Sequence, residues 1–210
     1  MLVLSGEDWE DKVTGAKSSP PWSAIKKQAK FGQMPLLTSS DGTDLAQSRA
    51  IARFLAQKVT INSAPLRPAD PWLCFQADEL VDALEDVRNK VVKTFAIKDQ
   101  AEKEAARGAL FAKGGDMHAG FSAIDKLVGS NGSANGYMLG DTFSLADLWC
   151  FIVVNQFRAG FLDGIPTDGW IDDMPELKAV VENVAAIPAV KAYYSGKAKK
   201  SGLFAAFIAK

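Results

Sequence analysis

The central stretch of the chain, residues 31–55, changes its pattern of hydrophobic and polar positions twice. Residues 34–37 form a short apolar run, and the polar triplet 40–42 after it is typical of a hairpin turn. From Leu45 onward, apolar side chains recur at steps of three and four, which indicates a helix. The stretch therefore predicts a strand, a turn, a second strand and a helix, with Pro35 at an edge or irregular position of the first strand.

Helical periodicity dominates the second part of the chain. Apolar residues recur at steps of three and four over 71–95, which predicts one long amphipathic helix. Residues 144–157 are apolar on nearly all sides, as in a buried central helix. Ser144 and Asp147 have the spacing of a capping box at the start of that helix, so we assign them to folding.

Glycine and proline mark the ends of the other predicted helices. The glycine pair 114–115 should separate a helix over 100–112 from one over 116–128. Pro175 and Pro188 each stand where a helix is expected to begin, since proline is well tolerated at the first helical position.

A linker divides the chain into two predicted domains. Three prolines within residues 62–71 block regular structure there. We expect a small α/β domain over residues 1–61 and an all-helical domain over 70–210. The apolar residues 1–4 are long enough for a single strand at the start of the first domain.

Composition narrows the class of protein. Apolar residues make up 48% of the chain and charged residues 23%, as in an ordinary soluble globular protein. The net charge of −1 gives no reason to expect nucleic acid or an anionic membrane as a partner. No apolar run is long enough for a membrane span, and the start is too short for a signal peptide. One histidine and two distant cysteines favour buried thiols over a metal site, a disulfide or a Ser-His-Asp triad.

The start of the predicted helix is the strongest candidate site. Gln47 and Ser48 stand there, and the free N–H groups and positive dipole at a helix start suit a carboxylate. Ser48 is also a plausible helix cap, and the two roles are compatible because both use the same helix end. If the Met34–Pro35 bond is cis, the backbone groups of Met34 can face outward and pair with an extended peptide. Together these features predict a site for a small acidic peptide.

Residues 32–35 and 47–53 resemble the glutathione-binding segment of cytosolic glutathione transferases, on the alpha/mu/pi/sigma side and most like sigma. The resemblance implies an N-terminal thioredoxin-like domain followed by a C-terminal helical bundle domain. It further implies a cytoplasmic, homodimeric detoxification enzyme. Stable membrane anchoring is not expected, because the one short basic and apolar stretch at the end of the sequence gives only marginal membrane binding. Glutathione would be the co-substrate, and its thiolate would attack apolar small-molecule electrophiles.

The same resemblance implies roles for individual residues. Asp86 would reach across the dimer to the partner's ligand, although a solvated helix face explains it equally well. Ser144 and Asp147 match a structural cap of the family. The residues implied to bind glutathione within one chain are Trp22, Lys26, Gln33, Met34, Pro35, Gln47 and Ser48.

The resemblance fails at the start of the chain. In that family a strand and a helix precede this segment, and the loop between them carries the catalytic tyrosine, serine or cysteine. Tyrosine occurs here only at Tyr137, Tyr193 and Tyr194, so the catalytic residue is unknown. We favour a gene model truncated at its start, which predicts weak or absent transferase activity. The alternatives are a non-catalytic structural or scaffold protein and a glutathione-dependent isomerase of the prostaglandin synthase type.

Overall fold

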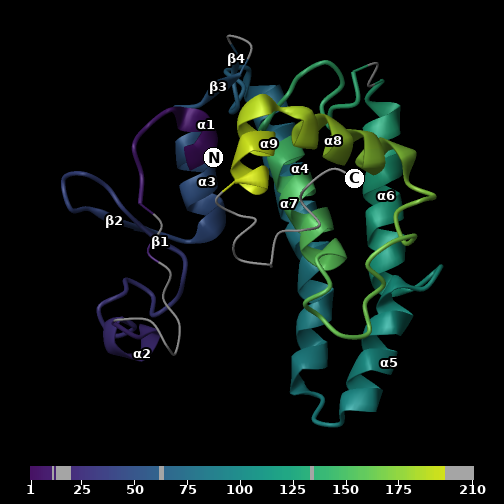
Figure 1. Ribbon diagram of the computed structural model, residues 1–210. Coiled ribbons are helices and arrows are strands. Elements are labelled where there is room, and N and C mark those ends of the chain that lie inside the picture. Colours follow the sequence, from purple (N-terminus) through teal and green to yellow (C-terminus); the bar gives the residue numbers. More distant parts are fainter. Residues whose placement is uncertain (11, 13–19, 62–63, 133–134, 197–210) are drawn as a thin grey trace. The chain divides into compact units, whose positions relative to one another are not determined.

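The computed structural model describes residues 1–10, 12, 20–61, 64–132 and 135–196 (Figure 1). The chain forms two compact units, Met1–Pro65 and Leu66–Lys210.

The first unit combines short helices with two small antiparallel sheets. Strands β1 and β2 pair with Leu36 opposite Ala46, and β3 and β4 form the second sheet. The elements of the described part are α1 (Leu2–Ser5), α2 (Trp22–Ile25), β1 (Leu36–Thr38), β2 (Asp44–Ala46), α3 (Ser48–Ala56), β3 (Thr60–Ile61) and β4 (Ala64–Pro65).

The predicted hairpin and the helix after it are confirmed. The turn between β1 and β2 closes with the Ser39 N–H donating to the Thr43 carbonyl at 3.0 Å, and Gly42 takes a φ of 85°. Helix α3 follows and buries Ala52, Leu55 and Ala56. The linker prediction is wrong at one point, because Ala64–Pro65 pairs with β3 as a two-residue strand.

The predicted strand at residues 1–4 is wrong, because Leu2–Ser5 forms a short α-helix. The Leu4 and Ser5 N–H groups both donate to the Met1 carbonyl, at 2.9 and 3.1 Å. A four-residue apolar run has no period that separates strand from helix. A strand also needs a neighbouring strand for its backbone hydrogen bonds, whereas a helical turn satisfies them locally.

The second unit is helical throughout its described part. Helix α7 packs against α4 and α8, and α6 packs against the same two helices. The elements are α4 (Pro71–Asn89), the 3₁₀ helix η1 (Lys90–Ala96), α5 (Gln100–Phe111), α6 (Asp116–Ser130), α7 (Leu145–Arg158), α8 (Pro175–Ala186) and α9 (Pro188–Ser195).

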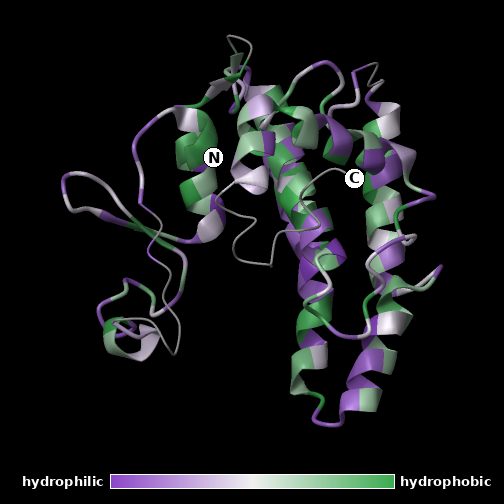
Figure 2. Cartoon of the chain, viewed as in Figure 1, coloured by the Kyte–Doolittle hydropathy of each residue, from purple (hydrophilic) through white to green (hydrophobic). Residues whose placement is uncertain are grey.

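The core of the second unit is built around α7 and an aromatic cluster. Figure 2 shows that α7 is hydrophobic along much of its length. Phe111 of α5 meets Phe157 of α7 edge to face at 5.2 Å, and Trp170 meets Phe111 at 5.1 Å and Phe121 at 5.0 Å. These rings join three helices and the segment before α8 through contacts that add to simple burial.

The helix boundaries follow the glycine and proline signals closely. The glycines at 114–115 lie between α5 and α6, and Pro175 and Pro188 open α8 and α9. The long helix predicted over 71–95 is confirmed as far as Asn89, after which the backbone tightens into η1. Within the described ranges, every helix is too short or too polar to cross a membrane.

Candidate functional site

The start of α3 has an unusual backbone. Gln47 precedes the helix with φ 72° and ψ 107°, which is rare for a residue other than glycine. Such conformations cost about 1–3 kcal/mol and occur most often at functional sites. The Gln47 side chain does not cap the helix, and its Nε2 instead donates to Oε1 of Gln33 at 3.1 Å.

The first turn of α3 is electrostatically suited to an anion. It contains no acidic residue, and the residue before it supplies no side-chain acceptor. The Ile51 N–H donates to the Gln47 carbonyl at 2.9 Å, so the N–H groups before Ile51 lie ahead of the helical hydrogen-bond ladder. Ser48, whose hydroxyl was predicted to cap the helix, is its first residue and is half-buried. These donors and the helix dipole favour a carboxylate here.

Residues 32 and 33 lie next to the side chains of Lys26 and Gln47, respectively. The Met34–Pro35 peptide bond is cis, and Met34 is 52% exposed. A Cβ atom built on Gly32 would lie 3.8 Å from Cε of Lys26, so the Lys26 side chain runs alongside the residue before Gln33. The structure therefore brings Gln33 and Gln47 into contact and places the Lys26 side chain beside Gly32, at the surface of the first unit. Trp22 is half-buried on the helical turn that leads to Lys26.

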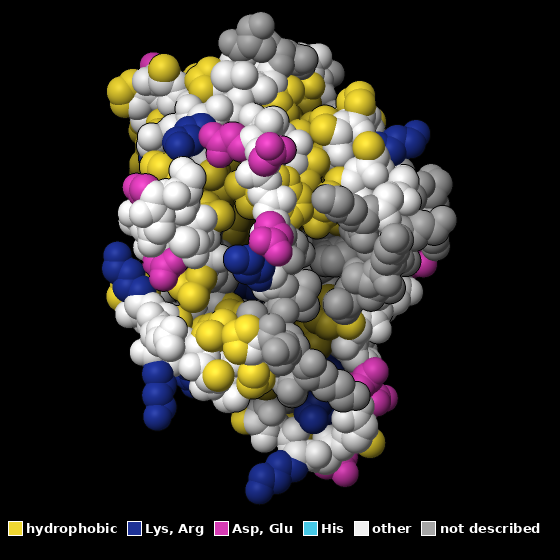
Figure 3. Space-filling view, turned by 60° about the vertical axis from the view of Figure 1, so that its left-hand side comes forward, with side chains coloured by type: hydrophobic (Ala, Val, Ile, Leu, Met, Phe, Trp, Pro, Cys, Tyr) yellow, Lys and Arg dark blue, Asp and Glu magenta, His cyan; other side chains and the backbone are white. Residues whose placement is uncertain are grey.

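Three large hydrophobic side chains of the first unit are exposed near the candidate site residues in sequence. Phe31, Met34 and Phe54 are 58%, 52% and 43% exposed. The Lys58 ammonium lies 5.0 Å from the centre of the Phe54 ring, within cation–π range. Figure 3 shows that hydrophobic side chains reach the surface of the molecule in several patches, with acidic and basic side chains between them.

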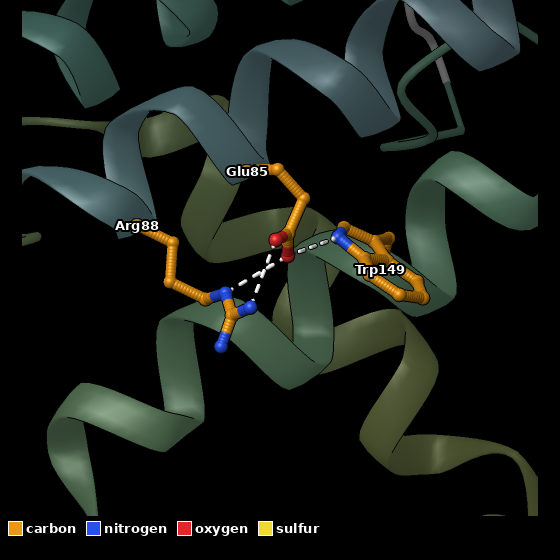
Figure 4. Close-up of polar contacts among 3 residues, drawn as sticks. All are labelled: Glu85, Arg88 and Trp149. Carbon is orange, nitrogen blue, oxygen red and sulfur yellow. Dashed lines mark hydrogen bonds and ion pairs between the residues drawn. The ribbon is translucent and has the colours of Figure 1, made fainter. Parts of the chain in front are cut away.

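Asp86 is exposed on α4, but the residue before it is buried and fully engaged. In Figure 4 the Glu85 carboxylate points toward both Arg88 and the Trp149 indole. Nε and Nη2 of Arg88 donate to its two oxygens at 2.8 Å each, and Nε1 of Trp149 donates to Oε1 at 3.0 Å. This link between α4 and α7 was not expected from the sequence. Its one sequence signal is an acid three residues before an arginine on a predicted helix.

Ser144 and Asp147 form a capping box at the start of α7. The Asp147 carboxylate accepts hydrogen bonds from the N–H of Met138 at 2.8 Å, and from the N–H and hydroxyl of Ser144 at 2.7 and 3.1 Å. Burial raises the pKa of Asp147 to about 6, and the hydrogen bonds oppose that rise. Both side chains are fully buried, so this pair has no access to a substrate.

Two reactive side chains of the second unit, Cys150 and Tyr194, are unsuited to nucleophilic chemistry. Burial raises the pKa of the Cys150 thiol well above its ordinary value, which keeps the thiol protonated. Burial, with a smaller contribution from Tyr193, raises the pKa of Tyr194 to about 12. Across the described ranges, no three His, Cys, Asp or Glu side chains gather in a way that could hold a metal ion.

Comparison with known proteins agrees with this architecture. Residues 85–197 match the family model described as glutathione S-transferase, C-terminal domain. The chain is 33% identical over 187 residues to probable glutathione S-transferase 7 of Caenorhabditis elegans, covering 88% of this chain and 82% of that one.

Solved structures share the fold. NaGST-2 superposes with a TM-score of 0.72 at 28% identity, over 93% of this chain and 87% of that one. A glutathione S-transferase from the hookworm Necator americanus, described as monomeric Na-GST-3, also gives 0.72, at 27% identity over 93% and 88% of the two chains. The expected fold, a thioredoxin-like N-terminal domain followed by a helical domain, is confirmed. The chain belongs to the glutathione S-transferase family.

Proposed function

We propose that this protein is a glutathione transferase that conjugates glutathione to apolar electrophiles, with its glutathione site in the first unit. The observation that carries the proposal is the contact between Gln33 and Gln47 at the uncapped start of α3. Two amide side chains and a helix start provide both donors and acceptors within one small region. A tripeptide with a carboxylate at each end needs such an arrangement.

Each group of the site has a chemical role in the proposal. The start of α3, with Ser48, receives the γ-glutamyl carboxylate, and Gln47 donates its side-chain amide to the same end. The backbone of Met34, before Pro35, pairs with the peptide as an added strand. Lys26 and the Trp22 indole meet the glycyl carboxylate. Residues 1–61 would thus carry the glutathione, and residues 70–210 would form the helical domain.

Calorimetry of glutathione binding tests the site directly. Gln47→Ala and Ser48→Ala should each weaken binding by about 1–3 kcal/mol, because each removes a hydrogen bond to a charged group. Gln57→Ala is the matched control, since Gln57 is exposed at the opposite end of α3. Unchanged affinity in both site variants would exclude this location.

One observation favours a second candidate, a glutathione-binding protein without catalysis. Residues 1–65 contain no tyrosine, whose hydroxyl lowers the thiol pKa in the resembling enzymes. A free thiol titrates near about 8.5, so without a donor most bound thiol stays protonated at neutral pH. A chromogenic-electrophile assay of the 210-residue chain separates the two candidates. Turnover that rises with glutathione saturation supports the transferase, and binding with no turnover above the uncatalysed rate supports the second candidate.

We also propose that the protein is a homodimer, with Asp86 near the partner's ligand, and that it acts in detoxification in the cytoplasm. Helix α4 carries a stacked pair, Trp72 and Phe75, whose ring centres lie 5.3 Å apart. These side chains are 64% and 51% exposed, and Asp86 is exposed further along the same helix. A second copy would cover this costly apolar surface.

Light scattering at micromolar concentration should therefore give about twice the chain mass. The double variant Trp72→Ser and Phe75→Ser should shift the protein toward the monomer, whereas Lys126→Gln on α6 should not. Asp86→Asn should weaken glutathione binding in the dimer. A monomer that binds glutathione with full affinity would remove the cross-chain role of Asp86. Na-GST-3 is itself described as monomeric.

A further inference from the structure

One arginine in the second unit is paired much less closely than two others. Arg88 bonds both oxygens of Glu85 at 2.8 Å, and Arg67 bonds Asp78 at 3.1 and 2.8 Å. In contrast, Nη2 of Arg158 lies 3.6 Å from Asp168.

The other donors of Arg158 are also poorly satisfied. Its Nη1 reaches the Asn155 Oδ1 only at 3.5 Å, and its Nε is buried without a hydrogen-bond partner among the described residues. An unpartnered buried donor costs free energy, and this cost is larger for a charged group. A planar guanidinium with open donors is well suited to accept a carboxylate.

A cavity of about 150 Å³ lies against Arg158. This volume exceeds the roughly 30 Å³ share of one water molecule and is sufficient for a small organic molecule. Lys178 and Glu182 of α8 line the cavity together with Asp168 and Asp172 from the segment before α8. Lys178 is itself loosely paired, with Nζ 3.4 Å from Oδ1 of Asp172.

The charges around the cavity select the class of ligand. Arg158 and Lys178 attract a carboxylate, whereas the three lining acids oppose a simple anion. Glu182 takes part in neither ion pair of the cavity. We propose that this cavity binds a small α-amino carboxylate, with the ligand carboxylate on Arg158 and the ligand ammonium on Glu182. The proposal is independent of the glutathione site, because all its residues belong to the second unit.

Titration of the full chain with glycine, followed by the backbone amide signals of Gly169 and Ile171, tests the proposal. Both residues line the cavity. We expect saturable shifts with glycine and about tenfold weaker binding of acetate or methylammonium, since each probe retains only one of the two charges. Failure of glycine to saturate these signals, or equal binding of glycine and acetate, would overturn the proposal.

Variants locate the two contacts. Arg158→Gln should weaken glycine binding by about tenfold or more, whereas Lys126→Gln, an exposed charge change on α6, should leave it unchanged. Glu182→Gln leaves the contacts of Arg158 with Asn155 and Asp168 in place and should abolish the preference for glycine over acetate. This second variant keeps the test decisive if Arg158→Gln does not fold. Glycine binding unchanged in Glu182→Gln would contradict the assignment.

Discussion

Helices α3 and α7 both begin at a pair of polar residues, but the free N–H groups of their first turns have different hydrogen-bond acceptors. At the start of α7, Ser144 and Asp147 are fully buried, and their side chains accept hydrogen bonds from nearby N–H groups. At the start of α3, Gln47 is exposed, gives no cap and takes a φ of 72°. One helix start is thus completed by the protein itself, while the other leaves its donors at the surface.

This difference separates a role in stability from a role in binding. A buried capping box lowers the free energy of the folded state by satisfying groups that water cannot reach. An uncapped helix start next to a strained residue raises the free energy of the folded state. A bound carboxylate can offset this increase. The same chemistry at a helix end therefore stabilises the fold in the second unit and, in our proposal, binds glutathione in the first.

The largest expected effect on stability is at the start of α7. Asp147→Ala should lower the free energy of unfolding by about 3–5 kcal/mol, because it leaves the Met138 and Ser144 N–H groups buried without acceptors. Asp147→Asn is the control, since its side-chain oxygen still accepts one of these bonds and the loss should be smaller. Urea denaturation measures both, and equal small losses would show that the cap is dispensable.

The pH dependence of stability gives a smaller and more specific signal. The pKa of about 6 for Asp147 in the folded protein lies above the ordinary value of 3.8, so the folded state binds the proton more tightly than the unfolded state. Stability from this group therefore increases as the pH falls through the folded pKa. Relative to Asp147→Asn, the native protein should gain about 1 kcal/mol between roughly pH 7 and pH 5. A gain in the opposite direction would contradict the burial effect.

The smallest expected effect on stability is at the start of α3, where a substitution should stabilise the protein. Gln47→Gly should raise the free energy of unfolding by up to about 1 kcal/mol, because glycine adopts a positive φ without strain. The same variant should weaken glutathione binding. Ser144→Gly, the matched change at α7, should instead lower the free energy of unfolding by roughly a few tenths of a kcal/mol. A loss of stability in both variants would show that Gln47 is not strained.

The apolar periodicity and the positions of glycine and proline were sufficient to predict most of the helices. The steps of three and four on α4 and the near-continuous apolar sequence of α7 leave few alternatives, and proline fixes the first residues of α8 and α9. The helix α1 was missed because a run of four apolar residues has no informative period. The transition from α4 to η1 was missed because the apolar stripe continues across it.

The candidate site was only partly accessible from the sequence. The residues at 47–48 predicted where α3 begins, but the hydrogen bond between Gln33 and Gln47 joins residues that are 14 apart. The Glu85–Trp149 bond and the cavity at Arg158 depend on contacts between separate helices, which no local pattern encodes. Long-range polar contacts therefore required the structure.

Backbone amide shifts on addition of glutathione test the central claim most directly. If glutathione binds at the start of α3, the N–H signals of Ser48 and Ala50 should shift in a saturable way. The signals of Gln33 and Met34 should follow the same curve. The N–H signals of Ala146 and Asp147 at the capped start of α7 should stay unchanged. Saturable binding of glutathione that leaves Ser48 and Ala50 unshifted would contradict the account.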